Sequence, residues 1–140
     1  MKIRVLFLCV HNSARSQIAE GLLRNMAGDS IEVFSAGSEP SRVNPFALRV
    51  LQDYGIDASA HYSKNVQEFV HEPFDYVITL CDDEVCPYFP NARTRLHWGM
   101  ADPSAAQGDT DEKLEAFRRT ADALDVRLRE FVQTLLQPDL

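Results

Sequence analysis

Residues 9–16 read Cys9-Val10-His11-Asn12-Ser13-Ala14-Arg15-Ser16 and stand between an apolar run, Ile3 to Leu8, and an amphipathic segment, Gln17 to Met26. The run predicts a buried strand, and the amphipathic segment predicts a helix. The strand then delivers Cys9 to a loop at a helix N-terminus, where backbone N–H groups and the helix dipole attract anions. Arg15 adds a guanidinium, and this field favours a thiolate. The stretch predicts a nucleophilic cysteine beneath a bound tetrahedral oxyanion.

Apolar runs alternate with helical patterns along the rest of the chain. Strands are predicted at 31–36, 76–80 and 94–98, and helices from Pro45 towards Gly55, at 66–70 and from about 111 to 136. This alternation predicts one α/β domain over residues 1–140, a four-stranded parallel sheet with helices on both faces. Ligands of such sheets bind beyond the carboxyl ends of the strands. Cys9 and Cys81 both follow predicted strands, so they are expected at the same rim.

The composition limits the classes of partner. The net charge of −7 argues against nucleic acid, because phosphate neutralisation needs a basic surface. The longest apolar run is too short to cross a membrane and is interrupted by Arg4, so neither a membrane span nor a signal peptide is expected. Three cysteines, an odd number, do not suggest a secreted disulfide scaffold. We therefore expect a cytoplasmic protein. We also expect a monomer, which the composition does not itself indicate.

The octapeptide has two other interpretations. Cys9 could be a structural cysteine beside an unrelated surface arginine, and a nucleotide-binding loop is disfavoured because no Gly-Lys-Ser/Thr follows. Asn12 tolerates the left-handed backbone that an anion cradle needs, and the Ser13 hydroxyl is suited to hydrogen-bond a thiolate. The expected oxyanion-binding residues are the loop itself and the start of the helix: Val10, His11, Asn12, Ser13, Ala14, Arg15 and Ser16.

The octapeptide resembles the signature of the low-molecular-weight tyrosine phosphatase family, which also has an Asp-Pro pair far downstream. Asp102-Pro103 supplies that pair here, although an Asp-Pro pair alone is more typical of a turn. The resemblance implies that Cys9 is the nucleophile. It also implies that Asp102 is the general acid that protonates the leaving oxygen.

The other two cysteines resemble those of the thioredoxin-coupled arsenate reductases, which share the phosphatase fold. The similar segments are Val77-Ile78-Thr79-Leu80-Cys81, Cys86-Pro87, Ser35-Ala36-Gly37, His97-Trp98-Gly99 and Gln107-Gly108. The resemblance implies that Cys9 attacks arsenate held by the loop and Arg15, and that Cys81 then releases arsenite through a transient Cys9–Cys81 disulfide. Cys86 attacks Cys81 next, and thioredoxin reduces the Cys81–Cys86 disulfide. No cofactor is implied.

Each transfer in this relay requires contact between two sulfur atoms. We therefore expect residues 82–93 to rearrange, and the acidic residues 82–84 to lie in an exposed loop. A zinc site is disfavoured because Cys81 and Cys86 lack a second ligand pair. A buried pair of inert thiols is the other alternative.

The chain departs from its relatives in three places. Ala14 stands where many carry a second cysteine, and the spacing from Cys81 to Cys86 is shorter. Some relatives bind potassium through residues that match Asn12, Glu20, Ser35 and an acid near Ser63. Lys64 falls where that acid is expected, and our hypothesis is that its ammonium replaces the ion by pairing with Glu20. The alternative is a solvated surface lysine, and no metal is expected in either case.

The leading prediction is an arsenate reductase that thioredoxin recycles. The alternative enzyme is a low-molecular-weight protein-tyrosine phosphatase that hydrolyses phosphate monoesters through a phosphocysteine at Cys9. An entrance to Cys9 lined by aromatic side chains would favour the phosphatase, and only Tyr62 and Tyr88 are candidates to line it. A third hypothesis is an arsenic or redox sensor, for which the acidic chain shows no DNA-binding element.

Overall fold

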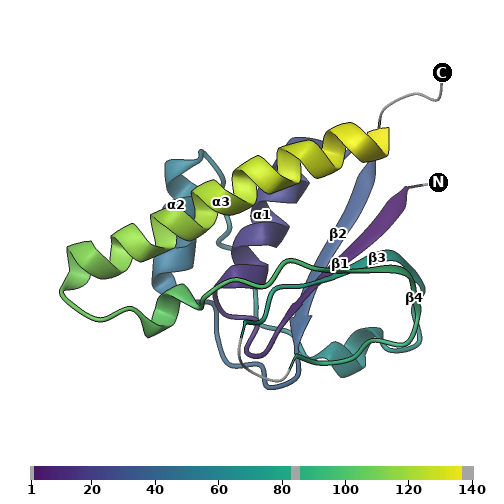
Figure 1. Cartoon of the computed structure of the whole chain (residues 1–140), viewed down its shortest axis with the longest axis horizontal. Helices are drawn as coiled ribbons and strands as arrows, with labels where there is room; N and C mark the ends of the chain where they lie inside the picture. Colours follow the sequence, from purple (N-terminus) through teal and green to yellow (C-terminus); the bar gives the residue numbers. More distant parts are fainter. Residues whose placement is uncertain (1, 83–85, 137–140) are drawn as a thin grey trace.

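The computed structural model describes residues 2–82 and 86–136, which form a parallel sheet packed with helices (Figure 1). The strands are β1 (Ile3–Cys9), β2 (Ile31–Gly37), β3 (Phe74–Thr79) and β4 (Ala92–His97), in the spatial order β2-β1-β3-β4. The helices are α1 (Arg15–Ala27), α2 (Pro45–Asp53) and α3 (Thr110–Leu136), with short 3-10 helices η1 (Val66–Phe69) and η2 (Pro103–Ala105). The predicted elements are confirmed, with ends that differ by one or two residues.

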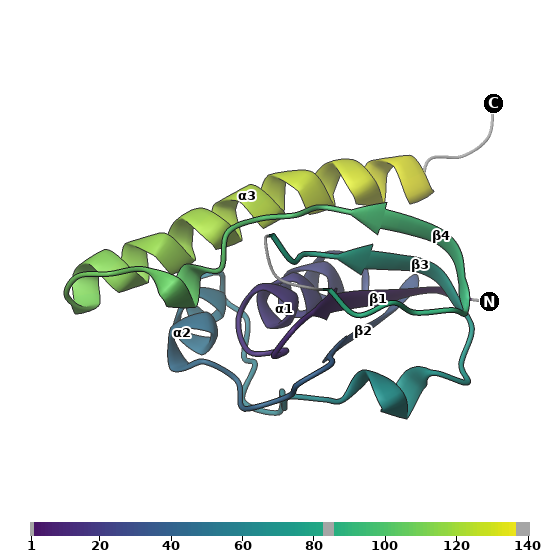
Figure 2. The ribbon, with the colours of Figure 1, turned by 60° about the horizontal axis from the view of Figure 1, so that its bottom comes forward.

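Both faces of β1 are buried, which explains its almost continuous apolar sequence. Val5 and Phe7 belong to a core cluster with residues of α1, α2 and α3. Leu6 and Leu8 belong to a second cluster with η1 and Phe89. Figure 2 shows η1 on the side of the molecule away from α3. The predicted class, a parallel sheet with helices on both faces, is confirmed, and the helix on the second face is the short η1.

Local signals explain where the helices begin and what they bury. The Asn44 side chain caps α2 by accepting a hydrogen bond from the N–H of Phe46 at 2.8 Å, and Pro45 occupies the first turn. The predicted apolar stripe of α3 is core, and its buried members are Leu114, Phe117, Ala121, Leu124, Leu128 and Phe131. None of the helices within the described ranges is both long and apolar enough to cross a membrane.

The strand register brings three chain segments to one rim of the sheet. Cys9 pairs with Gly37 of β2, and Thr79 of β3 pairs with Leu8 and with His97 of β4. Just past the end of β3, the N–H of Leu80 donates to the carbonyl of Leu8 at 2.9 Å. The octapeptide, the residues after β3 and the residues after β4 therefore meet at the carboxyl ends of the strands.

Candidate active site

The octapeptide joins β1 to α1 as predicted. Cys9 is the last residue of β1 and Arg15 is the first residue of α1. Asn12 has a φ of 49°, so it adopts the left-handed conformation that its residue type tolerates. This geometry makes the loop a compact turn over the end of the strand.

The segment after β2 fixes the direction of the loop's peptide groups. The carbonyls of Val10 and Ser13 accept hydrogen bonds from the N–H groups of Glu39 and Asn44, both at 2.9 Å. The carbonyl of His11 accepts from the N–H of Ser41 at 3.3 Å. Because the N–H of a trans peptide points opposite to its carbonyl, the next N–H in each case turns away from this segment. Those N–H groups are then available to an anion inside the loop.

A buried hydrogen-bond chain ends at the sulfur of Cys9. The Nδ2 of Asn12 donates to the Oγ of Ser16 at 2.8 Å and to the Oγ of Ser35 at 2.9 Å. The Ser16 oxygen lies 2.7 Å from the sulfur of Cys9. Since this oxygen already accepts from Asn12, its own hydrogen is left to stabilise the thiolate. Ser16 therefore makes the contact with Cys9 that the sequence predicted for Ser13.

Arg15 is buried and lies between the loop and the rim. Its Nη1 donates to the carbonyl of Leu80 at 3.3 Å and to that of Met100 at 3.0 Å. Its Nη2 lies 3.7 Å from the Oδ2 of Asp102. The guanidinium is thus held from the ends of β3 and β4, with Asp102 on its other side.

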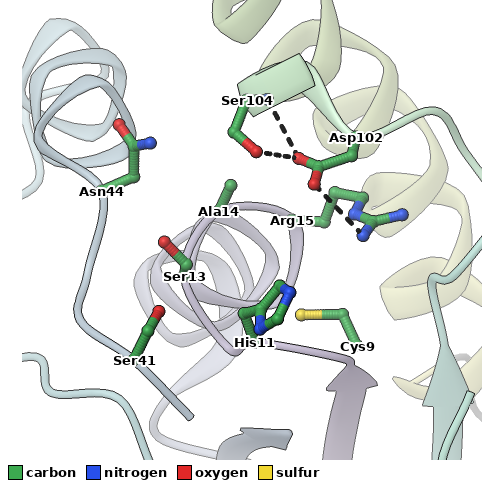
Figure 3. A pocket seen from close by; sticks show the side chains of 9 residues that line it. All are labelled: Cys9, His11, Ser13, Ala14, Arg15, Ser41, Asn44, Asp102 and Ser104. Atoms are coloured by element: carbon green, nitrogen blue, oxygen red, sulfur yellow. Dashed lines mark hydrogen bonds and ion pairs between the residues drawn. The ribbon is translucent and has the colours of Figure 1, made fainter. Parts of the chain in front are cut away.

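A cavity of about 290 Å³ opens above the loop, and its lining joins most of the predicted site (Figure 3). Cys9 lies at its base, while Asp102 and Ser104 enter from η2. The lining residues are small or polar: Cys9, His11, Ser13, Ala14, Arg15, Ser41, Asn44, Asp102 and Ser104. Neither Tyr62 nor Tyr88 is among them. The cavity therefore places small and polar side chains around the space above the Cys9 sulfur.

All three cysteines lie together beside this cavity. Cys9 and Cys81 form a small buried cluster with Val10, and Cys86 packs against it. Cys81 and Cys86 are joined by a disulfide with their Cα atoms 5.6 Å apart, and Cys9 is a free buried thiol. The predicted pairing of Cys81 with Cys86 is therefore present. The acidic residues 83 and 84 fall outside the described part of the chain, and Asp82 is exposed.

Lys64 is buried behind the loop, not solvated. Its Nζ lies 3.4 Å from the Oε1 of Glu20 and donates to the carbonyl of Tyr62 at 2.8 Å. Burial opposes the charge of Glu20, but Lys64, the hydrogen bond from Ser35, Arg24 and His61 together lower the pKa of Glu20 below its ordinary value. The Lys64 ammonium thus lies beside the Glu20 carboxylate, as the hypothesis of a Lys64–Glu20 pair expected. Within residues 2–82 and 86–136, no cluster of His, Cys, Asp and Glu is arranged to hold a metal.

Gln17, which connects this charged group to the loop, was not among the predicted site residues. Its Nε2 donates to the carbonyl and the Oδ1 of Asn12, at 3.2 and 3.0 Å, and its Oε1 lies 2.9 Å from the Nδ1 of His61. Because an amide oxygen only accepts, this contact requires a hydrogen on Nδ1 of His61. Gln17 directly follows Arg15 and Ser16 in the first turn of α1, and this position was the available sign that its side chain lies near the loop. The segment from Glu39 to Asn44 was also missed, because its role depends on tertiary contact.

A parallel sheet that carries a Cys-x5-Arg loop at its rim, with an Asp-Pro turn facing the arginine, defines a class of oxyanion-attacking enzymes. The chain belongs to the low molecular weight phosphotyrosine protein phosphatase family, whose model matches residues 4–139. It is 40% identical over 132 residues to an arsenate reductase of Halalkalibacterium halodurans, an alignment that covers 93% of this chain and 95% of that protein.

Two solved structures extend the similarity. An arsenate reductase in the phosphate binding state superposes with a TM-score of 0.82 at 32% identity, covering 96% of this chain and 98% of that one. A thioredoxin-dependent arsenate reductase of Corynebacterium glutamicum has a TM-score of 0.75 at 34% identity, covering 96% of this chain and 62% of that chain. Within the phosphatase family, the chain is therefore similar to reductases over almost its whole length.

Proposed function

We propose that this chain is an arsenate reductase in which Cys9, Cys81 and Cys86 form a disulfide relay. Thioredoxin then reduces the Cys81–Cys86 disulfide. The arrangement of the three cysteines carries the proposal. A phosphatase needs one nucleophilic cysteine, whereas this site packs two more sulfur atoms against Cys9 in one cluster. The similarity to arsenate reductases, one of them thioredoxin-dependent, supports the same conclusion.

The first step forms a bond between the Cys9 sulfur and arsenic. The inward N–H groups of the loop and the Arg15 guanidinium hold the arsenate, and Ser16 stabilises the attacking thiolate. One arsenic–oxygen bond breaks as the sulfur–arsenic bond forms. Asp102 gives a proton to the departing hydroxyl, which leaves as water.

The second step reduces arsenic. The Cys81 thiolate attacks the sulfur of Cys9, a disulfide forms, and the electron pair of the sulfur–arsenic bond passes to arsenic, which leaves as arsenite after taking up protons. Cys86 then attacks Cys81, which frees Cys9 and forms the Cys81–Cys86 disulfide. Cys86 is partly exposed while Cys81 is buried, so we expect the thioredoxin dithiol to enter at Cys86. Such a reductant works in a reducing compartment, which favours the cytoplasm.

The same nucleophile and loop are suited to attack a phosphate monoester, so phosphatase activity is the second candidate. Tyr62 and Tyr88 are largely exposed and do not line the cavity, and the rim consists of small polar residues such as Ser41 and Asn44. The residues that line the cavity include no Phe, Tyr or Trp ring against which an aromatic leaving group could stack. We expect hydrolysis of phosphotyrosine to be slow compared with reduction of arsenate.

Lys64 is proposed to take the place of a bound potassium ion. Its ammonium lies against Glu20 and its backbone N–H donates to Oδ1 of Asn12 at 2.8 Å. The backbone of Lys64 holds Asn12, and through it Ser16, while the ammonium compensates Glu20 without any ion from solution. The enzyme is then expected to be independent of potassium.

A coupled assay tests the proposed function. With thioredoxin, thioredoxin reductase and arsenate, the wild-type protein is expected to consume NADPH, and Cys9→Ser, Cys81→Ser and Cys86→Ser are each expected to abolish turnover. Full turnover in Cys86→Ser contradicts the relay and indicates a small-thiol or glutaredoxin route. Release of phosphate from aryl phosphates without arsenate-dependent NADPH consumption indicates the phosphatase. Binding of arsenic without turnover indicates a sensor.

A further inference from the structure

Asp102 presents two chemically different oxygens at the mouth of the cavity. Among the described residues, both hydrogen bonds that its carboxylate accepts go to Oδ1: one from the N–H of Ser104 at 2.9 Å and one from the Ser104 hydroxyl at 2.7 Å. Oδ2 lies 3.7 Å from Nη2 of Arg15 (Figure 3). Asp102 also caps η2, and the buried Pro103 follows it, so the backbone that carries this carboxylate is constrained.

The position of the acid proton follows from the donors around each oxygen. Oδ1 has two lone pairs, and they accept from the N–H and the hydroxyl of Ser104, so a hydrogen on Oδ1 has to displace one of these two donors. Without the hydroxyl, one lone pair of Oδ1 is free to carry the hydrogen. A hydrogen on Oδ2 meets the guanidinium of Arg15, which only donates. The acceptor for an Oδ2 hydrogen must therefore come from the cavity, and the group that Arg15 holds there is the anion.

We propose that Ser104 is a positioning residue that keeps Oδ1 of Asp102 occupied and so directs the acid proton to Oδ2, facing the oxygen that leaves arsenate. The proposal rests on the proposed function, because it needs Asp102 as the acid. As the arsenic–oxygen bond breaks, Oδ2 gives its hydrogen to the leaving hydroxyl, which departs as water. Asp102 becomes a carboxylate, and the two donors of Ser104 stabilise its new charge.

A single-turnover measurement without thioredoxin isolates this step. The fully reduced protein is mixed with increasing arsenate, and arsenite is measured after acid quench. For Ser104→Ala we expect the limiting rate constant to fall about tenfold, as for a misdirected general acid, with the arsenate concentration for half-maximal rate unchanged. Ser104→Thr keeps the hydroxyl and is expected to restore the rate.

The chain offers a matched control. Asp57-Ala58-Ser59 repeats the same spacing on the surface away from the cavity, with the N–H of Ser59 donating to Oδ1 of Asp57 at 3.0 Å. Ser59→Ala removes an equivalent serine without touching the site. Its limiting rate constant is expected to equal that of the wild type.

A double-mutant comparison shows whether Ser104 acts through Asp102. In an Asp102→Asn background, Ser104→Ala is expected to cause no further loss of rate. An unchanged limiting rate in Ser104→Ala, a failure of Ser104→Thr to restore it, or an equal loss in both backgrounds overturns the proposal. If Asp102→Asn alone is as fast as the wild type, the general acid of the proposed function is wrong and this proposal falls with it. If the wild-type protein forms no arsenite, the arsenate reductase itself is contradicted.

Discussion

Asn12 links the nucleophile to the buried cation with one short side chain. Its Nδ2 reaches Ser16, the neighbour of the Cys9 sulfur, and its Oδ1 accepts from the N–H of Lys64. No buried side-chain nitrogen or oxygen in the described ranges lacks a hydrogen-bond partner. A change at one residue of this network is therefore transmitted to the sulfur, because each lost partner leaves a buried polar group unsatisfied.

Lys64→Met is predicted to destabilise the fold and slow the enzyme. The change removes one of the cations beside the buried Glu20 carboxylate and leaves Arg24, 2.8 Å away, as its ion pair, which costs about 2 kcal/mol. Urea unfolding measures the loss, and Lys113→Met, at an exposed position of α3, is the matched control. Equal stability of the two variants contradicts the role of the buried pair.

Lys64→Asp is predicted to make the enzyme dependent on potassium. An acid at this position recreates the oxygen ligands that an ion needs beside Glu20, so activity lost by the substitution returns with potassium chloride more than with sodium chloride. The wild type is expected to respond equally to both salts. A strong and specific activation of the wild type by potassium contradicts the proposal that the Lys64 ammonium takes the place of the ion.

Stability is predicted to fall as the pH falls from about 7.5 to about 5.5. Burial lowers the pKa of His61 below its ordinary 6.5. The charges of Arg24 and Lys64 lower it further, and the Glu20 carboxylate opposes them by raising it. The pKa of Glu20 is also lowered, so the unfolded chain binds more protons than the folded one at both residues. The contribution of His61 is lost before that of Glu20, because a histidine of the unfolded chain binds its proton as the pH falls through its ordinary pKa of 6.5. Urea unfolding at the two pH values is expected to show a smaller loss in His61→Gln, and an unchanged loss contradicts the role of His61.

Sequence patterns predicted the strands and helices but not every contact of the loop. The apolar run before Cys9 and the stripe of α3 are local signals, and burial of both followed from periodicity. The contact of Ser16 with the Cys9 sulfur was assigned to Ser13, because the direction of each loop side chain depends on loop dihedrals that a pattern does not contain. The segment from Glu39 to Asn44 was missed because only the sheet register brings it against the loop.

Gly37→Ala is predicted to damage the site through the backbone. A Cβ at this position lies 2.4 Å from the carbonyl oxygen of Val10 and 2.9 Å from the nitrogen of Asn12, so the loop must move. We expect a loss of about 2 kcal/mol in stability and at least about tenfold in turnover. Gly55→Ala is a useful comparison, because its Cβ meets open space and only its φ of 78° is strained. Full activity in Gly37→Ala contradicts the close packing of β2 against the loop.

The protein is acidic overall but carries a local anion site. The net charge of −7 repels anions in general, so binding must come from the loop N–H groups and the buried Arg15. Inorganic phosphate is predicted to raise the melting temperature of the reduced protein by a few degrees. Arg15→Lys keeps the charge but loses the planar fork, and the rise is expected to shrink. An equal rise in both proteins indicates that phosphate binds elsewhere.

Reduction is distinguished from hydrolysis by what happens to the sulfur of Cys9 after the first attack. The most direct test uses reduced Cys86→Ser protein, arsenate and no external reductant, with disulfide mapping by mass spectrometry and arsenite measured in the same sample. The three-cysteine relay predicts one arsenite per chain and a trapped Cys9–Cys81 disulfide. Free thiols at Cys9 and Cys81 with no arsenite formed would contradict it.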